Sequence, residues 1–339
     1  MSIGPGLHLE HDLQRDNTLG LPCVAERFIA AETPATLAAA LETARRKAWP
    51  LTVLGGGSNL ILPRRLAGLV VQPTFAGWRY QRDADGRIRL RVDAGMNWHT
   101  LVMESVTRGW WGIENLALIP GHCGAAPIQN IGAYGVELAE VLESVELLHL
   151  ASGRQQTLPA SACHFGYRDS IFKGELEGRV VITALTLTLS ESPRPRLAYG
   201  DLASRVGAAP TPLEVAEAVA AIRREKLPDP AQLGNAGSFF KNPLVSAEQA
   251  RQLLADCPDM PHFEQSDGRV KLAAGWLIDR CGLKGLRRGA FGVHERQALV
   301  LVHHGGGDAE GLLTFAAEIA AAVEARFGVT LVREPRLAH

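Results

Sequence analysis

The stretch that decides the fold is NLALIPGHCGAAPIQNIGAYG, residues 115–135. Together with Val136 it forms the longest run of the chain without a charged side chain. The run holds four glycines, two prolines and three side-chain amides. It cannot span a membrane, because hydrocarbon would leave the amides and the broken backbone without hydrogen-bond partners. We therefore expect an ordered loop without regular structure. Long loops of this kind are usually functional.

The residue types of this stretch favour a flat ligand with polar edges. Glycine and alanine leave the backbone accessible, and neutral amides supply hydrogen bonds along an edge. An isoalloxazine ring needs both features, with nothing bulky over its face. A glycine-rich turn in the core is the alternative.

A second glycine-rich stretch, GGGSN at residues 55–59, directly follows the apolar run 51–54. Three glycines permit positive φ and a close ligand, and successive backbone N–H groups can form an anion-binding nest, to which Ser58 and Asn59 add donors. Leu60 stands where a G-x-G-x-x-G motif has its third glycine, no helix is expected to follow, and the chain has no Gly-Lys pair. If the stretch holds a pyrophosphate, it does so outside Rossmann and P-loop geometry, and a tight turn between two strands is the alternative.

Two further motifs carry groups suited to chemistry. In FGYRDS, residues 165–170, an arginine beside a tyrosine can clamp a carboxylate through two hydrogen bonds. The alternative is a surface ion pair between Arg168 and Asp169. In GNAGSFFKNP, residues 234–243, we expect Ser238 to be exposed by its turn and screened from water by the two phenylalanines, as a proton donor requires. The serine-hydrolase pattern Gly-x-Ser-x-Gly is not matched, and a turn with a capping serine is the alternative.

Local patterns predict helices and strands interspersed along the chain. Thr33 and Thr211 are each followed by proline, Glu214 completes a capping box, and Gly328 predicts a helix end. The expected buried helix faces are Leu37, Leu41, Ala44 and Ala48, then Val215, Val219 and Ile222, then Leu312, Ala316, Ile319, Val323 and Phe327. Alternation at 88–92 and 185–189, and apolar runs at 51–54 and 69–71, predict strands. The pattern is that of a mixed α and β protein.

Composition excludes several classes of protein. The 35 basic and 36 acidic residues leave a net charge of −1, without the basic excess of proteins that bind nucleic acid or membrane surfaces. Five cysteines without a C-x-x-C pair predict reduced, mostly buried thiols in a cytoplasm. Residues 1–10 lack the basic start and apolar core of a secretion signal. His303–His304 and His294–Glu295 lack ligand-spaced partners, so we expect structural or solvated histidines and no metal site.

In this order, the motifs resemble the type I branch of the UDP-N-acetylenolpyruvoylglucosamine reductase (MurB) family. The resemblance covers residues 17–334 and is carried by GGGSN, NLALIPG with GAAPIQNIGAYG, FGYRDSIFK, KLPDP with GNAGSFFKNP, and KLAAGWLID. It implies an α+β protein, with a two-part FAD-binding fold of the vanillyl-alcohol-oxidase (PCMH) type and a C-terminal α/β substrate-binding domain. The implied parts are 1–75 and 76–205 for FAD, and 206–339 for substrate, with the chain's end returning to the active site. The stretch 191–212, rich in proline, glycine and alanine, agrees with the second boundary.

The family's reaction has two halves. NADPH gives a hydride to FAD, and the reduced FAD passes it to UDP-N-acetylglucosamine enolpyruvate, which becomes UDP-N-acetylmuramate for peptidoglycan. The resemblance implies that Arg168 and Glu334 stabilise the enol-like intermediate and that Ser238 delivers the proton. It implies substrate contacts at Tyr167, Tyr199, Lys226, Asn242 and Lys271, with Tyr199 closing over the substrate. It implies FAD contacts at Gly55, Gly56, Gly57, Ser58, Asn59, Gly121, Gly124, Ala125, Ala126, Ile128, Gln129, Asn130, Gly132, Ala133 and Tyr134.

The sequence departs from the family pattern at a few positions. The usual Pro-Glu-Val-Arg run reads Arg333-Glu334-Pro335-Arg336, and proline restricts the preceding glutamate to extended conformations. His122 and Cys123 replace smaller or apolar residues, and Leu19 replaces a phenylalanine.

An oxidase of the same fold and a non-catalytic nucleotide-sugar binder are the alternative functions. We expect a cytoplasmic monomer.

Overall fold

In the computed structural model, which describes residues 6–339, the helices begin and end where the sequence places capping residues. The Thr33 side chain accepts the Thr36 N–H at the start of α1 (Pro34–Arg46), and Thr211 and Glu214 cap α3 (Pro212–Lys226) reciprocally. Helix α6 (Ala309–Phe327) ends at Gly328, which has a φ of 63°. These expectations are confirmed. The expected burial of Ala48 is wrong, because α1 ends at Arg46 and Ala48 lies beyond it in a left-handed, exposed position.

The described residues divide between two compact units that interleave along the sequence. Unit 1 comprises residues 6–11, 25–57 and 66–225, and unit 2 comprises residues 12–24, 58–65 and 226–339. Two short N-terminal segments therefore fold with the C-terminal third of the chain. The functional division at residues 75 and 205 stays a prediction.

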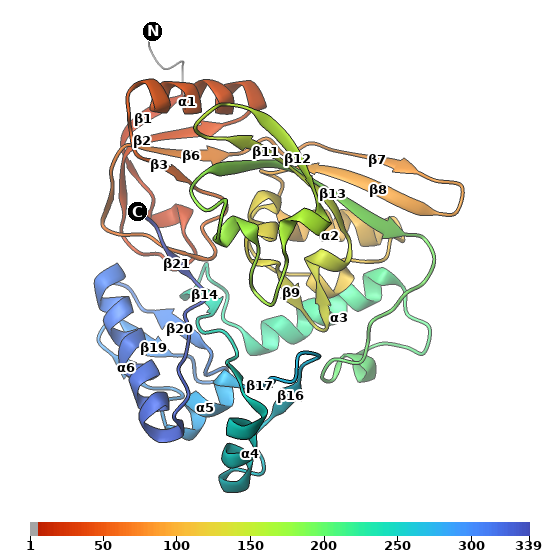
Figure 1. Ribbon diagram of the computed structural model, residues 1–339, viewed down its shortest axis with the longest axis vertical. Helices are drawn as coiled ribbons and strands as arrows, with labels where there is room; N and C mark the ends of the chain where they lie inside the picture. Colours follow the sequence, from red (N-terminus) through yellow and green to blue (C-terminus); the bar gives the residue numbers. More distant parts are fainter. Residues whose placement is uncertain (1–5) are drawn as a thin grey trace. The chain divides into compact units, whose positions relative to one another are not determined.

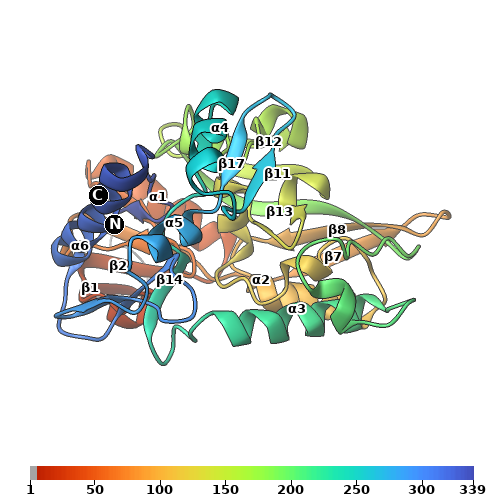
Figure 2. The same cartoon turned by 90° about the horizontal axis from the view of Figure 1, so that it is seen from below.

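The larger sheet of unit 1 is antiparallel, in the order β12-β11-β13-β8-β7. Its strands are β7 (Trp78–Arg82), β8 (Arg87–Asp93), β11 (Leu142–His149), β12 (Gln155–Pro159) and β13 (Val180–Ser190). The expected alternation in β8 is confirmed, because Ile88, Leu90 and Val92 are buried. Helices α2 (Trp98–Thr107) and α3 lie on one face of this sheet (Figure 2).

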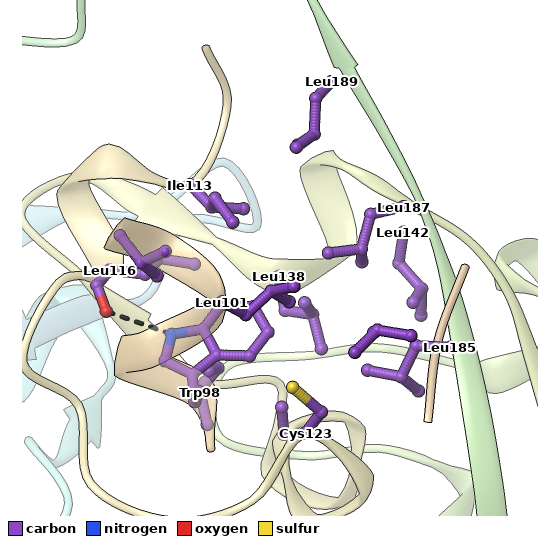
Figure 3. Close-up of a cluster of buried hydrophobic side chains, with 14 of the residues drawn as sticks. Trp98, Leu101, Ile113, Leu116, Cys123, Leu138, Leu142, Leu185, Leu187 and Leu189 are labelled. Carbon is purple, nitrogen blue, oxygen red and sulfur yellow. Dashed lines mark hydrogen bonds between the residues drawn. The ribbon is translucent and has the colours of Figure 1, made fainter. Parts of the chain in front are cut away.

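A leucine-rich core joins this sheet to α2. Figure 3 shows Leu185, Leu187 and Leu189, at alternate positions of β13, on the same side as Trp98 and Leu101 of α2. The indole N–H of Trp98 donates to the Leu116 carbonyl at 3.0 Å, so its one polar atom is satisfied within the core. The apolar face of α3 packs on the same core through Val215, Val219 and Ile222.

The second sheet of unit 1 has the order β1-β2-β6-β3. Its strands are β1 (Leu7–Asp12), β2 (Val24–Ala31), β3 (Leu51–Val53) and β6 (Leu69–Pro73), and β6 pairs in parallel with β2 and β3. Leu37, Ala40, Leu41 and Ala44 of α1 share a buried cluster with Ile29, Leu69 and Val71 of this sheet. The short strand β3 delivers the chain directly into the turn 55–57.

Unit 2 holds two small antiparallel sheets, β14-β20-β19-β18 and β15-β17-β16, and the pair β21-β4. Its strands are β4 (Leu60–Ile61), β14 (Gly234–Ser238), β15 (Leu244–Val245), β16 (His262–Glu264), β17 (Val270–Leu272), β18 (Arg287–Arg288), β19 (Phe291–Val293), β20 (Val300–His303) and β21 (Arg336–Leu337). The short strand β5 (Arg65–Leu66) belongs instead to the second sheet of unit 1, where it pairs with β2. Its helices are α4 (Ala247–Asp256), α5 (Ala274–Arg280) and α6. Helix α6 packs on β19 (Figure 1). The Phe315 ring of α6 stacks on the Phe291 ring of β19.

The cysteines are free thiols, and Cys23, Cys123 and Cys163 are buried. Burial raises the pKa of Cys23 and of Cys163 to about 11, so both stay protonated and unreactive near neutral pH. Mostly buried thiols are as the sequence predicts. Within residues 6–339, no helix has the length and apolarity needed to cross a bilayer.

We expect Leu187→Ala to lower the free energy of unfolding by about 2–5 kcal/mol, because it removes a fully buried side chain from β13. Urea unfolding followed by circular dichroism measures the change. Thr188→Ala, at the next and partly exposed position of β13, is the matched control. Equal effects of the two substitutions would contradict the core placed between β13 and α2.

Candidate active site

The turn 55–57 and the segment 115–135 pack backbone against backbone in unit 1. A Cβ added at Gly56 would lie 2.7 Å from the Gly121 Cα, and one added at Gly55 would lie 3.4 Å from the Ala125 Cβ. The contact at Gly56 is shorter than a real Cβ tolerates, so the close approach requires glycine. Of the three turn glycines only Gly57 has a positive φ, 60°, so close approach rather than left-handed backbone explains the glycine at position 56.

The segment 115–135 is more regular than the sequence suggests. It contains the 3₁₀ helix η3 (Cys123–Gln129), and the two-residue strand β9 (Gly132–Ala133) pairs with β10 (Val136–Glu137). The expectation of a loop without regular structure is therefore wrong. Short 3₁₀ turns leave no long periodic pattern in a sequence, which explains the error.

Main-chain hydrogen bonds fasten this segment to the residues after β8. The Cys123 N–H donates to the Met96 carbonyl at 2.8 Å, and the Gly124 N–H donates to the Ala94 carbonyl at 2.9 Å. A Cβ at Gly124 would lie 2.7 Å from the Ala94 Cβ, so position 124 also requires glycine.

The Asn130 amide holds the segment together. Its Nδ2 donates to the Glu137 carboxylate at 2.7 Å and to the Gly166 carbonyl at 3.1 Å, and its Oδ1 accepts the Ala139 N–H at 2.9 Å. Asn130 is buried and has a φ of 46°. Its side chain thus makes hydrogen bonds within the protein, whereas the sequence suggests a ligand contact at this position.

Arg168 occupies the tip of a tight turn beside this segment. Gly166 and Asp169 exchange main-chain hydrogen bonds, and Arg168 between them has a φ of 54°. Its Nη2 donates to the Gly132 carbonyl at 2.7 Å, and its own carbonyl accepts from Lys173 Nζ at 3.2 Å. A non-glycine residue in left-handed backbone costs about 1–3 kcal/mol and is a mark of functional sites.

Gly132 completes the approach of Arg168 to the segment. A Cβ at position 132 would lie 3.0 Å from Arg168 Nη1. The Ser170 hydroxyl donates to the Ile128 carbonyl at 2.6 Å and so ties the same turn to η3. The Tyr167 ring lies 5.5 Å from the Arg168 guanidinium carbon. The structure therefore brings the FGYRDS motif and the glycine-rich segment together.

Sequence reasoning missed Arg223 on α3. Its Nε is buried and has no hydrogen-bond partner within residues 6–339. Burial and the positive charge of Arg168 lower the pKa of the Arg223 guanidinium, and nearby Tyr134 partly offsets this decrease. Arg223 lies four residues after the buried Val219, so it shares the apolar face of α3. A charged residue in that register was the signal that could have revealed it.

Tyr199 lies against the glycine-rich segment in unit 1. Its ring meets the Tyr134 ring edge-on at 5.7 Å, and 53% of the residue is exposed. Burial raises the pKa of the Tyr134 phenol, so Tyr134 remains a neutral hydrogen-bond donor.

The residues of the segment suit a flavin. Within residues 6–339, His122 Nδ1 is buried without a hydrogen-bond partner, and burial lowers the His122 pKa, so the ring is neutral. A buried polar atom without a partner is costly unless a ligand or water satisfies it. The turn 55–57 packs on Gly121 with no side chain between them, and this main-chain surface together with the His122 ring fits a polar-edged, planar group.

The segments that carry Ser238 and Glu334 are neighbours in unit 2. β14 ends at Ser238, and the Glu334 N–H donates to the Phe239 carbonyl at 2.9 Å, which places the glutamate directly beside the serine's strand. Glu334 is 8% exposed. The expected screening of Ser238 by Phe239 and Phe240 is wrong, because both rings are buried in the core of unit 2 and Ser238 is exposed.

The remaining predicted residues of unit 2 lie on several different elements. Asn242 Oδ1 accepts the Ala274 N–H at 3.0 Å at the start of α5. Lys271 lies on β17 with its ammonium 5.8 Å from the centre of the Phe263 ring, and Lys226 is the last residue of α3. Asn59 Nδ2 lies 3.5 Å from the Glu334 carbonyl, and Ser58 precedes it. Arg168 and Tyr199 belong to unit 1, whereas these residues, Ser238 and Glu334 belong to unit 2.

Of the histidines considered in the sequence, His303 has structural partners. His303 Nδ1 lies 2.8 Å from the Leu19 carbonyl, and its Nε2 accepts the Gly307 N–H at 3.0 Å. The structural role expected for His303 is confirmed. Across residues 6–339, no group of three or more His, Cys, Asp or Glu side chains is placed to hold a metal ion.

Two family descriptions match the chain. Residues 25–159 match an FAD binding domain, and residues 229–338 match the C-terminal domain of UDP-N-acetylenolpyruvoylglucosamine reductase. The first range contains both the turn 55–57 and the segment 115–135, and the second contains Ser238 and Glu334. The expected fold class, an FAD-binding fold followed by the C-terminal domain of this family, is confirmed.

Relatives match along nearly the whole chain. The UDP-N-acetylenolpyruvoylglucosamine reductase of Cupriavidus pinatubonensis is 52% identical over 97% of this chain and 98% of its own length. That of Chromobacterium violaceum is 49% identical over 96% of both chains. The crystal structure of the Thermus caldophilus enzyme (MurB) superposes with a TM-score of 0.66 at 25% identity, covering 98% of each chain.

We expect Gly56→Ala to release FAD, because the new Cβ forces the turn 55–57 away from Gly121. Overpacking of this kind costs about 1–3 kcal/mol. The ratio of flavin to protein absorbance in purified protein measures FAD content. Gly207→Ala, at a position with open space and without a left-handed φ, is the matched control. Full FAD content in Gly56→Ala would contradict the role of this contact.

Proposed function

The chain belongs to the UDP-N-acetylenolpyruvoylglucosamine reductase family, and from that premise we propose that it reduces UDP-N-acetylglucosamine enolpyruvate to UDP-N-acetylmuramate with NADPH and FAD. This reaction completes a peptidoglycan precursor and so serves cell-wall biogenesis and cell division. The observation that carries the proposal is the glycine-only contact of Gly56 with Gly121, which brings together the two stretches expected to hold FAD.

FAD, when bound, supplies two-electron chemistry by accepting a hydride from NADPH and delivering one to the substrate's methylene carbon. We assign its binding to the backbone and side chains of residues 55–59 and 121–134. At Gly56 and Gly124 the space that a side chain would need is filled by Gly121 and Ala94, which packs the cradle tightly, and the buried His122 Nδ1 is available to a polar partner.

Arg168 binds the substrate carboxylate in this proposal. A planar guanidinium can give a carboxylate two parallel hydrogen bonds while Nη2 keeps its bond to the Gly132 carbonyl. When the methylene carbon gains a hydride, the electron pair of the double bond moves onto the neighbouring carbon and its carboxylate. A fixed positive charge at that carboxylate stabilises this developing negative charge.

Ser238 completes the reaction as proton donor. Its Oγ–H bond breaks, and a new C–H bond forms at the carbon that carries the carboxylate. A serine hydroxyl is a weak acid, so this transfer is reasonable only to a strongly basic carbon. Because Ser238 is exposed, water can return a proton to its oxygen after turnover. Glu334, held beside the serine's strand by the Phe239 carbonyl, assists in stabilising the enol-like species.

The other contacts serve the nucleotide sugar. We assign substrate binding to Tyr167, Tyr199, Lys226, Asn242 and Lys271. The two lysines suit the diphosphate, since ammonium groups pair well with phosphate oxygens.

We further propose that the protein acts as a cytoplasmic monomer. Five free thiols suit a reducing compartment. Within residues 6–339, the large exposed hydrophobic residues belong to different segments, and single exposed hydrophobic residues of this kind are ordinary on the surface of monomers: Leu9, Tyr80, Tyr199, Phe263 and Val332.

The function and the role of Ser238 are tested by the two half-reactions. Anaerobic NADPH should bleach the flavin absorbance near ~450 nm, and enolpyruvyl substrate should restore it. In Ser238→Ala we expect normal bleaching and a recovery slower by about 10²–10⁴-fold, because only the second half needs the proton. Stopped-flow absorbance measures both. Ser266→Ala, at an exposed turn, is the control.

Two results would count against these assignments. Bleaching without recovery in the unmodified protein would favour an oxidase of the same fold. Equal slowing of both halves in Ser238→Ala would remove this residue from proton transfer.

Arg168→Lys should slow the second half-reaction by about ten- to a hundredfold, because an ammonium cannot reproduce a two-point clamp. The rate of absorbance recovery with enolpyruvyl substrate is the measurement. Arg179→Lys, an exposed arginine of the same unit, should behave like the unmodified protein. An unchanged rate in Arg168→Lys would exclude Arg168 from the carboxylate site.

A further inference from the structure

Asn115 lies where two functional segments meet. It belongs to the 3₁₀ turn η2 (Glu114–Leu116) and is fully buried. Its Nδ2 donates to the Tyr134 carbonyl and to the Arg196 carbonyl, each at 2.8 Å. One side-chain amide therefore connects the glycine-rich segment to the Tyr199 segment, defined here as residues 193–201.

Both bonds end on backbone that needs support. Tyr134 has a φ of 49°, and its carbonyl is held by Asn115. A cavity of about 280 Å³ is lined by Arg194 and Arg196 of the Tyr199 segment and by Trp111. The segment is therefore incompletely packed at this point.

Further contacts complete the junction. The Tyr134 and Tyr199 rings meet edge-on at 5.7 Å, and a Cβ at Gly135 would lie 3.6 Å from the Tyr199 Cβ. Leu197 packs on the leucine-rich core. The Arg196 guanidinium lies 3.5 Å from the exposed Glu140 carboxylate, an ion pair of small energetic value. Of the contacts at this junction, the two hydrogen bonds of Asn115 are the polar ones made by a buried side chain.

We propose that Asn115 is a positioning residue that fixes the Tyr199 segment against the glycine-rich segment and so sets the affinity for the enolpyruvyl substrate. The inference rests on the substrate-binding role proposed for Tyr199. A side-chain amide is required because both partners are acceptors, and only an –NH₂ group offers two donors from one atom in this space.

Asn115→Asp keeps the shape of the side chain and removes both donors. We expect KM for the enolpyruvyl substrate to rise about tenfold, with kcat unchanged. Hydrogen–deuterium exchange of residues 193–201, measured by mass spectrometry on the FAD-loaded protein without substrate, should become faster. Arg196→Ala is the matched control, because it removes the side chain but keeps the carbonyl that Asn115 binds.

A double-mutant cycle with Tyr199→Ala separates this inference from the proposed function. If Asn115 acts through Tyr199, the double variant has the KM of Tyr199→Ala alone, and additive effects overturn the inference. If Tyr199→Ala leaves KM unchanged, the proposed role of Tyr199 fails. Exchange at 193–201 then decides the inference by itself, since faster exchange in Asn115→Asp supports the tie and unchanged exchange overturns it.

A folding defect has its own outcome. Asn115→Ala, which buries no carboxylate, takes the place of Asn115→Asp if the latter does not retain FAD. Loss of FAD from both variants overturns the inference, because the amide would then be needed by the glycine-rich segment itself rather than for the position of Tyr199.

Discussion

The site depends on backbone approaching backbone where no Cβ can stand. A Cβ at position 56 would lie 2.7 Å from the Gly121 Cα, and one at position 124 would lie 2.7 Å from the Ala94 Cβ. Each glycine therefore lets its main chain pack closer to the neighbouring segment than any other residue allows. Arg168 then uses the carbonyl that Gly132 leaves accessible. A cradle of this kind is rigid because it is made of close-packed main chain, so its geometry tolerates little change in the residues that form it.

Capping residues and short hydrophobic patterns predicted individual helices and strands. They could not predict which segments pair when they are far apart in the sequence. Thr33, Thr211 and Gly328 mark helix ends because capping is decided within four residues. The assignment of residues 12–24 and 58–65 to unit 2 depends on partners far along the chain, such as the Asn235 N–H that donates to the Thr18 carbonyl. No periodicity reports such a pair. The candidate site was found because its motifs are contiguous, whereas Arg223 belongs to no motif.

Polar residues in the glycine-rich segment show where residue type misleads. The neutral amides suggested hydrogen bonds to the edge of a ligand. Asn115 and Asn130 instead donate their side-chain N–H groups to carbonyls and a carboxylate of the protein. Irregular backbone exposes more unpaired carbonyls than a helix or sheet does, so side-chain amides are required to satisfy them. In the same way, the phenylalanines after Ser238 serve the core. A polar motif in an irregular segment therefore indicates a scaffold as much as a ligand.

The hydrogen bonds of the C-terminal backbone explain why proline is tolerated at position 335. The N–H groups that the C-terminal segment uses alternate: Glu334 donates to Phe239, Arg336 to Asn59 and Ala338 to Ile61. In extended chain, the N–H of position 335 points away from these partners. Proline removes that donor and holds Glu334 extended, as the bridge at Arg333 and the pairing of β21 with β4 already require. The departure from the family pattern thus falls at a position where the backbone loses nothing it uses.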